Sequence, residues 1–77
     1  QIDNKKAHAL LLEAVRINGE DYHSLYELGC NYMSKGKRGV TKDLGMAKKY
    51  LQKAKTLAEH AGDKDYQDRI GKRLSKL

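Results

Sequence analysis

The sequence predicts an all-α fold of about four helices that pair as antiparallel hairpins, and three observations support this prediction. The 77 residues contain no Pro, while Lys, Leu, Ala and Glu, which favour helices, are spread along the chain. Apolar residues recur every three or four positions in four segments, as they do on one face of a helix. The first and third of these segments also share a pattern at an offset of 40 residues.

The first helix is expected to begin after Asp3 or Asn4, because either side chain can accept hydrogen bonds from the free amides of a first turn. The pair Asn18-Gly19 predicts its end, where glycine can adopt a left-handed conformation. The expected core-facing stripe comprises Ala7, Leu10, Leu11, Ala14 and Ile17.

The second helix follows at once and is expected to end near Gly36. Glu20 and Asp21 place negative charge at its start, which the helix dipole favours. Its stripe repeats the same spacing with Leu25, Leu28, Gly29 and Tyr32. The loop that follows, up to Lys42, is short and carries two glycines, as a tight antiparallel connection needs when the backbone must adopt positive φ.

The third helix has the longest apolar stripe. Asp43 is placed to cap its first turn and Gly62 to stop it. The residues between them that share one face are Ala47, Tyr50, Leu51, Ala54, Leu57, Ala58 and Ala61. A fourth helix is expected from about Lys64. Its narrower stripe, set among basic residues, comprises Tyr66, Ile70, Leu74 and Leu77.

An internal repeat aligns the first helix with the third. Asp3-x-x-x-Ala7-x-x-Leu10-Leu11-x-x-Ala14 matches Asp43-x-x-x-Ala47-x-x-Tyr50-Leu51-x-x-Ala54, and Ile70-Gly71 echoes Leu28-Gly29. Small residues let helix backbones approach closely, while tyrosines such as Tyr32 fill the remaining gaps. The alternative is a generic four-helix bundle with coincidental similarity.

The segment from Ser24 to Ala58 carries one whole repeat unit, at Leu28-Gly29, Tyr32, Gly36, Gly39-Val40, Asp43, Ala47, Tyr50 and Lys53-Ala54. This combination resembles the SEL-one-like repeat, a relative of the tetratricopeptide repeat. In two departures, Lys37-Arg38 makes the loop one residue longer than the commonest form, and Lys55 replaces the second Ala usual after Ala54. The resemblance implies a short right-handed α-solenoid that acts as a non-catalytic adaptor or scaffold for protein–protein interaction, with ligands in the concave face formed by first helices.

The expected organisation is a single repeat domain over residues 1–77, and we expect it to be a fragment of a longer protein because the chain begins without Met. Residues 1–19 would be the second helix of a preceding repeat, 20–62 a complete repeat, and 63–77 a capping helix or the start of the next repeat. Leu12 and Val15 lie off the stripe of the first helix, and their exposure would suit a preceding repeat.

No catalytic constellation is evident, and we expect no enzyme activity, cofactor or metal. The histidines are scattered over three segments, and the single thiol, Cys30, has no base that the sequence identifies. His23 and Cys30 would share one helical face, but zinc needs further ligands at recognisable spacing. A groove-lining or half-buried pair is therefore favoured over a metal or thiol–base pair.

The resemblance places six residues of the second helix in the concave groove, away from the packing stripe: His23, Tyr26, Glu27, Cys30, Met33 and Ser34. Tyr and Met suit a binding surface because they offer large apolar area with one polar or polarisable group. The alternative for Tyr26 and Met33 is packing against the neighbouring helix. The expected partner is a protein or peptide whose identity the sequence leaves open.

Positive charge is concentrated in the second half of the chain. Residues 1–34 carry three Lys/Arg against five Asp/Glu, and residues 35–77 carry thirteen against five, which gives −2 and +8. The basic surface around the loop comprises Lys35, Lys37, Arg38 and Lys42. Electrostatic binding of nucleic acid or an acidic surface is thus an alternative function. The simplest interpretation of the basic half is a solvated face without a binding role. A third possible function for the chain is a structural cap or spacer next to a catalytic domain.

The longest apolar run, Ala9 to Leu12, is far shorter than the roughly 20 residues that span a bilayer, so we expect no transmembrane segment and a soluble chain. A single cysteine permits no internal disulfide, which favours an intracellular location.

Overall fold

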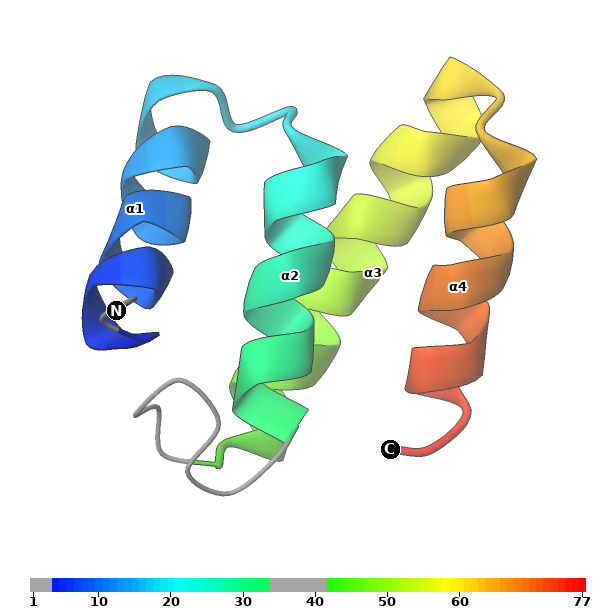
Figure 1. Cartoon of the computed structure of the whole chain (residues 1–77). Helices are drawn as coiled ribbons and strands as arrows, with labels where there is room; N and C mark the ends of the chain where they lie inside the picture. Colours follow the sequence, from blue (N-terminus) through cyan, green and yellow to red (C-terminus); the bar gives the residue numbers. More distant parts are fainter. Residues whose placement is uncertain (1–3, 34–41) are drawn as a thin grey trace.

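The structure of the chain is a computed structural model that describes residues 4–33 and 42–77. These ranges contain four helices: α1 (Asn4–Ile17), α2 (Tyr22–Met33), α3 (Leu44–Ala61) and α4 (Lys64–Leu74). Each helix runs antiparallel to the one before it, so that α1–α2, α2–α3 and α3–α4 form successive hairpin-like pairs (Figure 1). The all-α prediction is therefore confirmed.

Capping residues explain where α3 begins and ends and where α4 begins. The Asp43 carboxylate accepts a hydrogen bond from the Met46 amide at 3.1 Å, as predicted for the start of α3. Gly62 ends α3 in the left-handed conformation with φ 71°, and the next amide, that of Asp63, donates to the Ala58 carbonyl at 3.0 Å. Asp63 is then the N-cap of α4, so two residues stop one helix and start the next.

The end of α1 differs from its prediction in conformation but not in position. Gly62 alone among the described glycines has a positive φ, so the predicted left-handed stop at Gly19 is wrong. Asn18 closes the turn instead, because its side-chain oxygen accepts from the Glu20 amide and its carbonyl from the Asp21 amide, both at 3.1 Å. A polar side chain can close this turn without requiring positive φ from the glycine.

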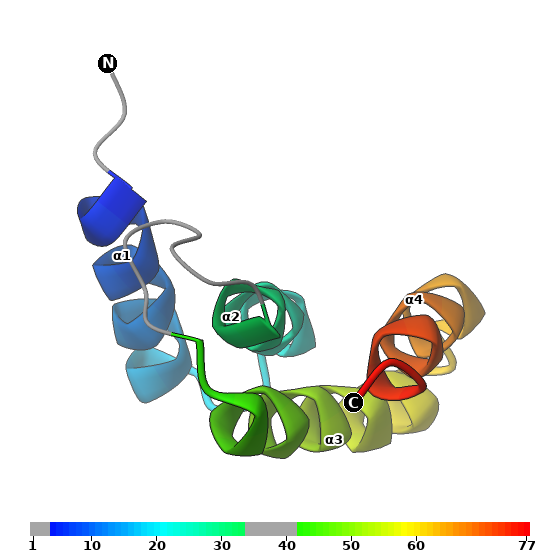
Figure 2. The ribbon, with the colours of Figure 1, turned by 90° about the horizontal axis from the view of Figure 1, so that it is seen from below.

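The four helices form two layers, with α1, α2 and α4 in one and α3 in the other (Figure 2). Seen along α2, α3 lies across one side of it, while α1 and α4 flank it on opposite sides (Figure 2). Helix α2 packs against each of the other three, and α4 also packs against α3. The predicted hairpin of α2 and α3 is thus the centre of the molecule.

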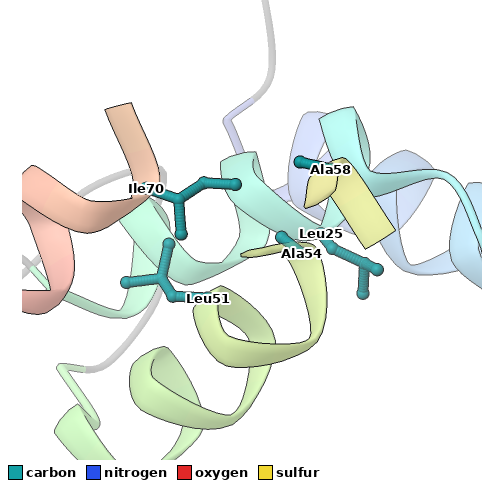
Figure 3. Close-up of a cluster of buried hydrophobic side chains, with 5 residues drawn as sticks. All are labelled: Leu25, Leu51, Ala54, Ala58 and Ile70. Atoms are coloured by element: carbon teal, nitrogen blue, oxygen red, sulfur yellow. The ribbon is translucent and has the colours of Figure 1, made fainter. Parts of the chain in front are cut away.

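The hydrophobic core joins α2, α3 and α4. Its side chains, each at most 2% exposed, are Leu25, Leu51, Ala54, Ala58 and Ile70 (Figure 3). At Gly29 the backbones of α2 and α3 approach so closely that an added Cβ would lie 2.6 Å from Leu51 Cγ. The rings of Tyr32 and Tyr50 stack beside this contact with centroids 5.9 Å apart, as expected for tyrosines that fill gaps between helices.

Helix α1 presents a different face to α2 than the sequence predicts. Leu10 and Ile17 of the predicted stripe are 61% and 73% exposed. Val15, which was expected to be exposed, instead packs against the core, whereas Leu12 is exposed as expected. The reason is that a periodic stripe identifies an apolar face but not the helix that covers it. Helix α2 covers the equivalent face of α3, whereas the stripe of α1 is covered only in part, with Leu11 and Ala14 half-buried.

The contact between α1 and α2 is partly polar. The Asn31 side chain is fully buried, and its amide nitrogen lies 3.2 Å from His8 Nδ1. The His8 ring also meets the Tyr32 ring edge to face, with centroids 5.3 Å apart. Burial lowers the pKa of His8, so the neutral ring that can accept from Asn31 is favoured.

None of the described helices combines the length and the apolar character needed to cross a membrane.

Candidate functional site

The first two turns of α2 and the first turn of α4 bring four aromatic rings together at one face of the molecule. Tyr66 of α4 is at the centre, with ring centroids 5.6 Å from Tyr22, 4.4 Å from His23 and 5.5 Å from Tyr26. The planes of these pairs cross at 73° to 79°, which is the edge-to-face geometry that aromatic rings prefer. These four residues are called the aromatic cluster below.

Asp63 fixes the position of the cluster by linking the starts of α2 and α4. Its Oδ1 accepts a hydrogen bond from the Tyr66 amide at 3.1 Å, which caps α4. Its Oδ2 accepts from the Tyr22 hydroxyl at 2.8 Å, across 41 positions of sequence. One carboxylate therefore sets the first turn of α4 and holds it against α2.

The same hydrogen bonds change the acidities of both partners. The backbone hydrogen bond from Tyr66, followed by that from the Tyr22 hydroxyl, lowers the pKa of Asp63. The pKa of Tyr22 is raised chiefly because its hydroxyl donates to that carboxylate. The link is thus strongest when Asp63 is ionised and Tyr22 is protonated, as both are at neutral pH.

This arrangement makes stability depend on pH through Asp63. Because its pKa in the folded chain lies below the ordinary value of 3.8, the stabilisation is present above pH 3.8 and is lost as the pH falls through the folded pKa. We expect Asp63→Asn to melt below the parent chain at neutral pH, and the gap to close in more acidic solution. Thermal melts followed by circular dichroism over this range measure it.

Asp68→Asn is the matched control for that experiment, because it removes one exposed carboxylate from the same helix without touching the cap. A gap between Asp63→Asn and the parent that stays constant through the acidic range, or that Asp68→Asn reproduces, would contradict the role given to Asp63.

Two arginines extend the aromatic cluster along α4. The Arg69 guanidinium carbon lies 5.3 Å from the centroid of the Tyr66 ring, within the range of a cation–π contact. One turn later, Arg73 is half-buried beside Tyr26. Its pKa is raised mainly by hydrogen bonding to Tyr26, with smaller contributions from the charges of Cys30, Tyr26 and Glu27. Arg69 and Arg73 are therefore held next to rings contributed by both helices.

The structure brings some of the predicted groove residues to this face and buries others. His23 is exposed, and Tyr26 and Glu27 are half-buried at the α2–α4 face. Cys30, in contrast, is buried at 5% exposure, and Met33 is half-buried against the core. Tyr26 packs against the core as well, so the alternative of helix packing applies to it in addition to its place in the cluster.

Several predicted positions fall outside the described residues. These are Ser34 of the groove and Lys35, Lys37 and Arg38 of the basic surface. Lys42, the remaining member of the basic surface, is exposed. Further exposed lysines follow on α3: Lys48, Lys49, Lys53 and Lys55.

Sequence reasoning missed the α4 half of the site, namely Tyr66, Arg69 and Arg73. Ile70-Gly71 repeats Leu28-Gly29 at an offset of 42 residues, and at this offset Arg69 stands where Glu27 stands in α2. The repeat could thus have identified Arg69 as a groove position. No comparable signal identifies Tyr66, because its place in the cluster depends on the Asp63 link.

A shallow hollow of about 300 Å³ adjoins the cluster where α2 begins and α3 ends. It is lined by Glu20, Tyr22, Leu57, His60 and Ala61. Within residues 4–33 and 42–77, no three His, Cys, Asp or Glu side chains are grouped closely enough to hold a metal ion. What the α2–α4 face offers chemically is aromatic area and guanidinium hydrogen-bond donors, which suit recognition.

In comparisons with known proteins, no protein-family model, curated protein or solved structure matched the chain.

Proposed function

We propose that the chain is a non-catalytic protein–protein interaction module, an adaptor or scaffold that binds a partner protein or peptide through the face between α2 and α4. The observation that supports this most is the aromatic cluster flanked by Arg69 and Arg73. Tyrosine and arginine are the residue types most enriched at energetically dominant positions of protein interfaces, along with tryptophan.

The arrangement of the helices also supports this proposal. Helices α2 and α4 run in the same direction and lie on one side of α3, with their first turns linked by Asp63 (Figure 2). In a SEL-one-like solenoid, which the sequence resembles, first helices of consecutive repeats would be placed in this way and would line the concave face. The α2–α4 face would then be the surface on which a partner segment is bound.

Selection of peptides from a random displayed library on the immobilised 77-residue chain tests the proposal. A selected peptide, made with a fluorescent label, is titrated with the parent chain and with the double variant His23→Ala, Arg69→Ala. Both side chains are exposed, so the variant is expected to fold. We expect its affinity to fall at least about tenfold, because each truncation removes part of a central contact.

The matched control is Gln52→Ala, Lys55→Ala, which also removes one polar side chain and one cation, from exposed positions of α3. Its affinity is expected to stay within about twofold of the parent. Equal affinity of the site variant and the parent would exclude the α2–α4 face as the binding site. Failure to select any peptide would favour the structural cap or spacer instead.

A further inference from the structure

Charged residues are distributed unevenly between α2 and α4, and their distribution bears on the charge of the partner. From residue 69 to the end of the sequence, α4 and the residues after it contain four cations, Arg69, Lys72, Arg73 and Lys76, and no acid. Across the groove, Glu27 is the single carboxylate of α2. The end of α4 and the residues after it are therefore positively charged, and Glu27 is the one acid that α2 sets against them.

The carboxylate nearest the cluster is already used within the protein. Asp63 accepts hydrogen bonds from both the Tyr66 amide and the Tyr22 hydroxyl, so its oxygens are turned toward the link between the helices. Arg69 is exposed, and its planar guanidinium presents several N–H donors. Such a group binds a carboxylate with two parallel hydrogen bonds.

The geometry of the rings argues against nucleic acid at this face. Single-stranded nucleic acid binds where bases can stack on free aromatic faces. Here the Tyr66 ring is approached at steep angles by the rings of Tyr22, His23 and Tyr26, and Arg69 lies 5.3 Å from its centroid. The rings of the cluster cover one another and present mixed edges and faces, which suit the side chains of a protein segment better than a run of bases.

Accepting the proposed function, on which this step rests, we propose that the segment bound between α2 and α4 is acidic, with its Asp or Glu carboxylates on Arg69 and Arg73 and its apolar side chains on the aromatic cluster. Arg73 follows Arg69 by four residues in α4, so the two guanidiniums are about one turn apart on the same side of the helix. The partner chemistry is a carboxylate-bearing peptide with at least one apolar or aromatic neighbour.

The test repeats the peptide selection with three forms of the chain. The parent is expected to enrich Asp and Glu over the starting library. Arg69→Glu, Arg73→Glu is expected to reverse this preference toward Lys and Arg, since like charges in the groove repel acidic peptides and attract basic ones. The single variant Arg69→Glu, at an exposed position, provides the same reversal in weaker form should the double variant fold poorly.

For one acidic peptide, affinity is then measured against Arg69→Gln, Arg73→Gln and against the control Lys48→Gln, Lys49→Gln. Each double variant removes two positive charges, but the control removes them from exposed positions of α3 and leaves α4 unchanged. A loss of about tenfold or more in the arginine variant and about twofold or less in the control is expected, because charge-assisted contacts are lost only in the first.

The outcomes separate the two proposals. If peptides bind the parent chain but are not enriched in Asp and Glu, the proposal of an acidic partner is wrong and the proposal of an interaction module stands. Absence of any bound peptide overturns the module itself. A pool of single-stranded oligonucleotides that displaces the acidic peptide in the parent chain, and does so less well after Arg69→Gln, Arg73→Gln, would identify nucleic acid as the ligand and overturn the acidic partner.

Discussion

Gly29→Ala is expected to destabilise the protein severely, whereas Gly71→Ala is expected to stabilise it, although the two glycines hold the same place in the repeat. At Gly29 an added Cβ would lie 2.6 Å from Leu51 Cγ, 2.8 Å from its Cδ2 and 3.3 Å from the Ala47 carbonyl oxygen. Leu51 is fully buried and the carbonyl belongs to the backbone, so neither can move aside without repacking the hairpin. Overpacking of this kind costs about 1 to 3 kcal/mol.

At Gly71 nothing lies within 4 Å of the added Cβ, and the residue is inside α4. Replacing an interior helical glycine by alanine stabilises by about 0.5 to 1 kcal/mol, because the unfolded chain loses conformational freedom. For a chain of this size, 1 kcal/mol corresponds to about 4 to 8 °C in melting temperature. Thermal melts followed by circular dichroism should thus move in opposite directions. A rise in melting temperature for Gly29→Ala would mean that the close approach of α2 and α3 at Gly29 is wrong, and a fall for Gly71→Ala would contradict the open space at Gly71.

Ile70→Ala is expected to cost about 2 to 5 kcal/mol, the usual cost of truncating a fully buried aliphatic side chain. Ile70 is the one fully buried residue among the described residues of α4, and it belongs to the same buried cluster as Leu25 and Leu51 (Figure 3). Its loss removes the main contact that holds α4 on the hairpin. Urea unfolding measures the loss of stability, and the near-ultraviolet circular dichroism of the tyrosines reports whether the aromatic cluster loosens.

Leu10→Ala is the matched comparison, because the sequence places Leu10 and Ile70 alike on core-facing stripes. Leu10 is 61% exposed in the structure, so its truncation is expected to change stability by no more than about 0.5 kcal/mol. Equal losses in the two variants would show that α1 turns the predicted stripe toward the rest of the protein after all.

The sequence was sufficient to predict the four helices because their signals are local. Asp43 and Gly62 act within one turn of their own positions, and the apolar spacing of the third helix identifies Ala47, Leu51 and Ala54, all of which are fully buried. Which side of α1 packs against the other helices could not be predicted in the same way. Its apolar residues cover more than one face, and which face is buried depends on which helices lie beside it.

The candidate site was predictable only on its α2 side. Helical spacing separates His23, Tyr26 and Glu27 from the packing stripe, but it cannot tell how far each of them is buried, and Cys30 proved to be in the interior. The α4 side depends on a hydrogen bond between residues 41 positions apart, from Tyr22 to Asp63. No periodicity within either helix carries that information.

The position of α4 at the edge of the packing has a consequence for binding equilibria. Because α4 contacts only α2 and α3 among the described helices, its local opening is expected to cost less free energy than global unfolding. Under the proposed function, molecules with α4 undocked would lack half of the binding face and would not bind a segment that bridges the two helices. The measured affinity is then the intrinsic affinity multiplied by the population with α4 docked, and a bound partner raises that population in return.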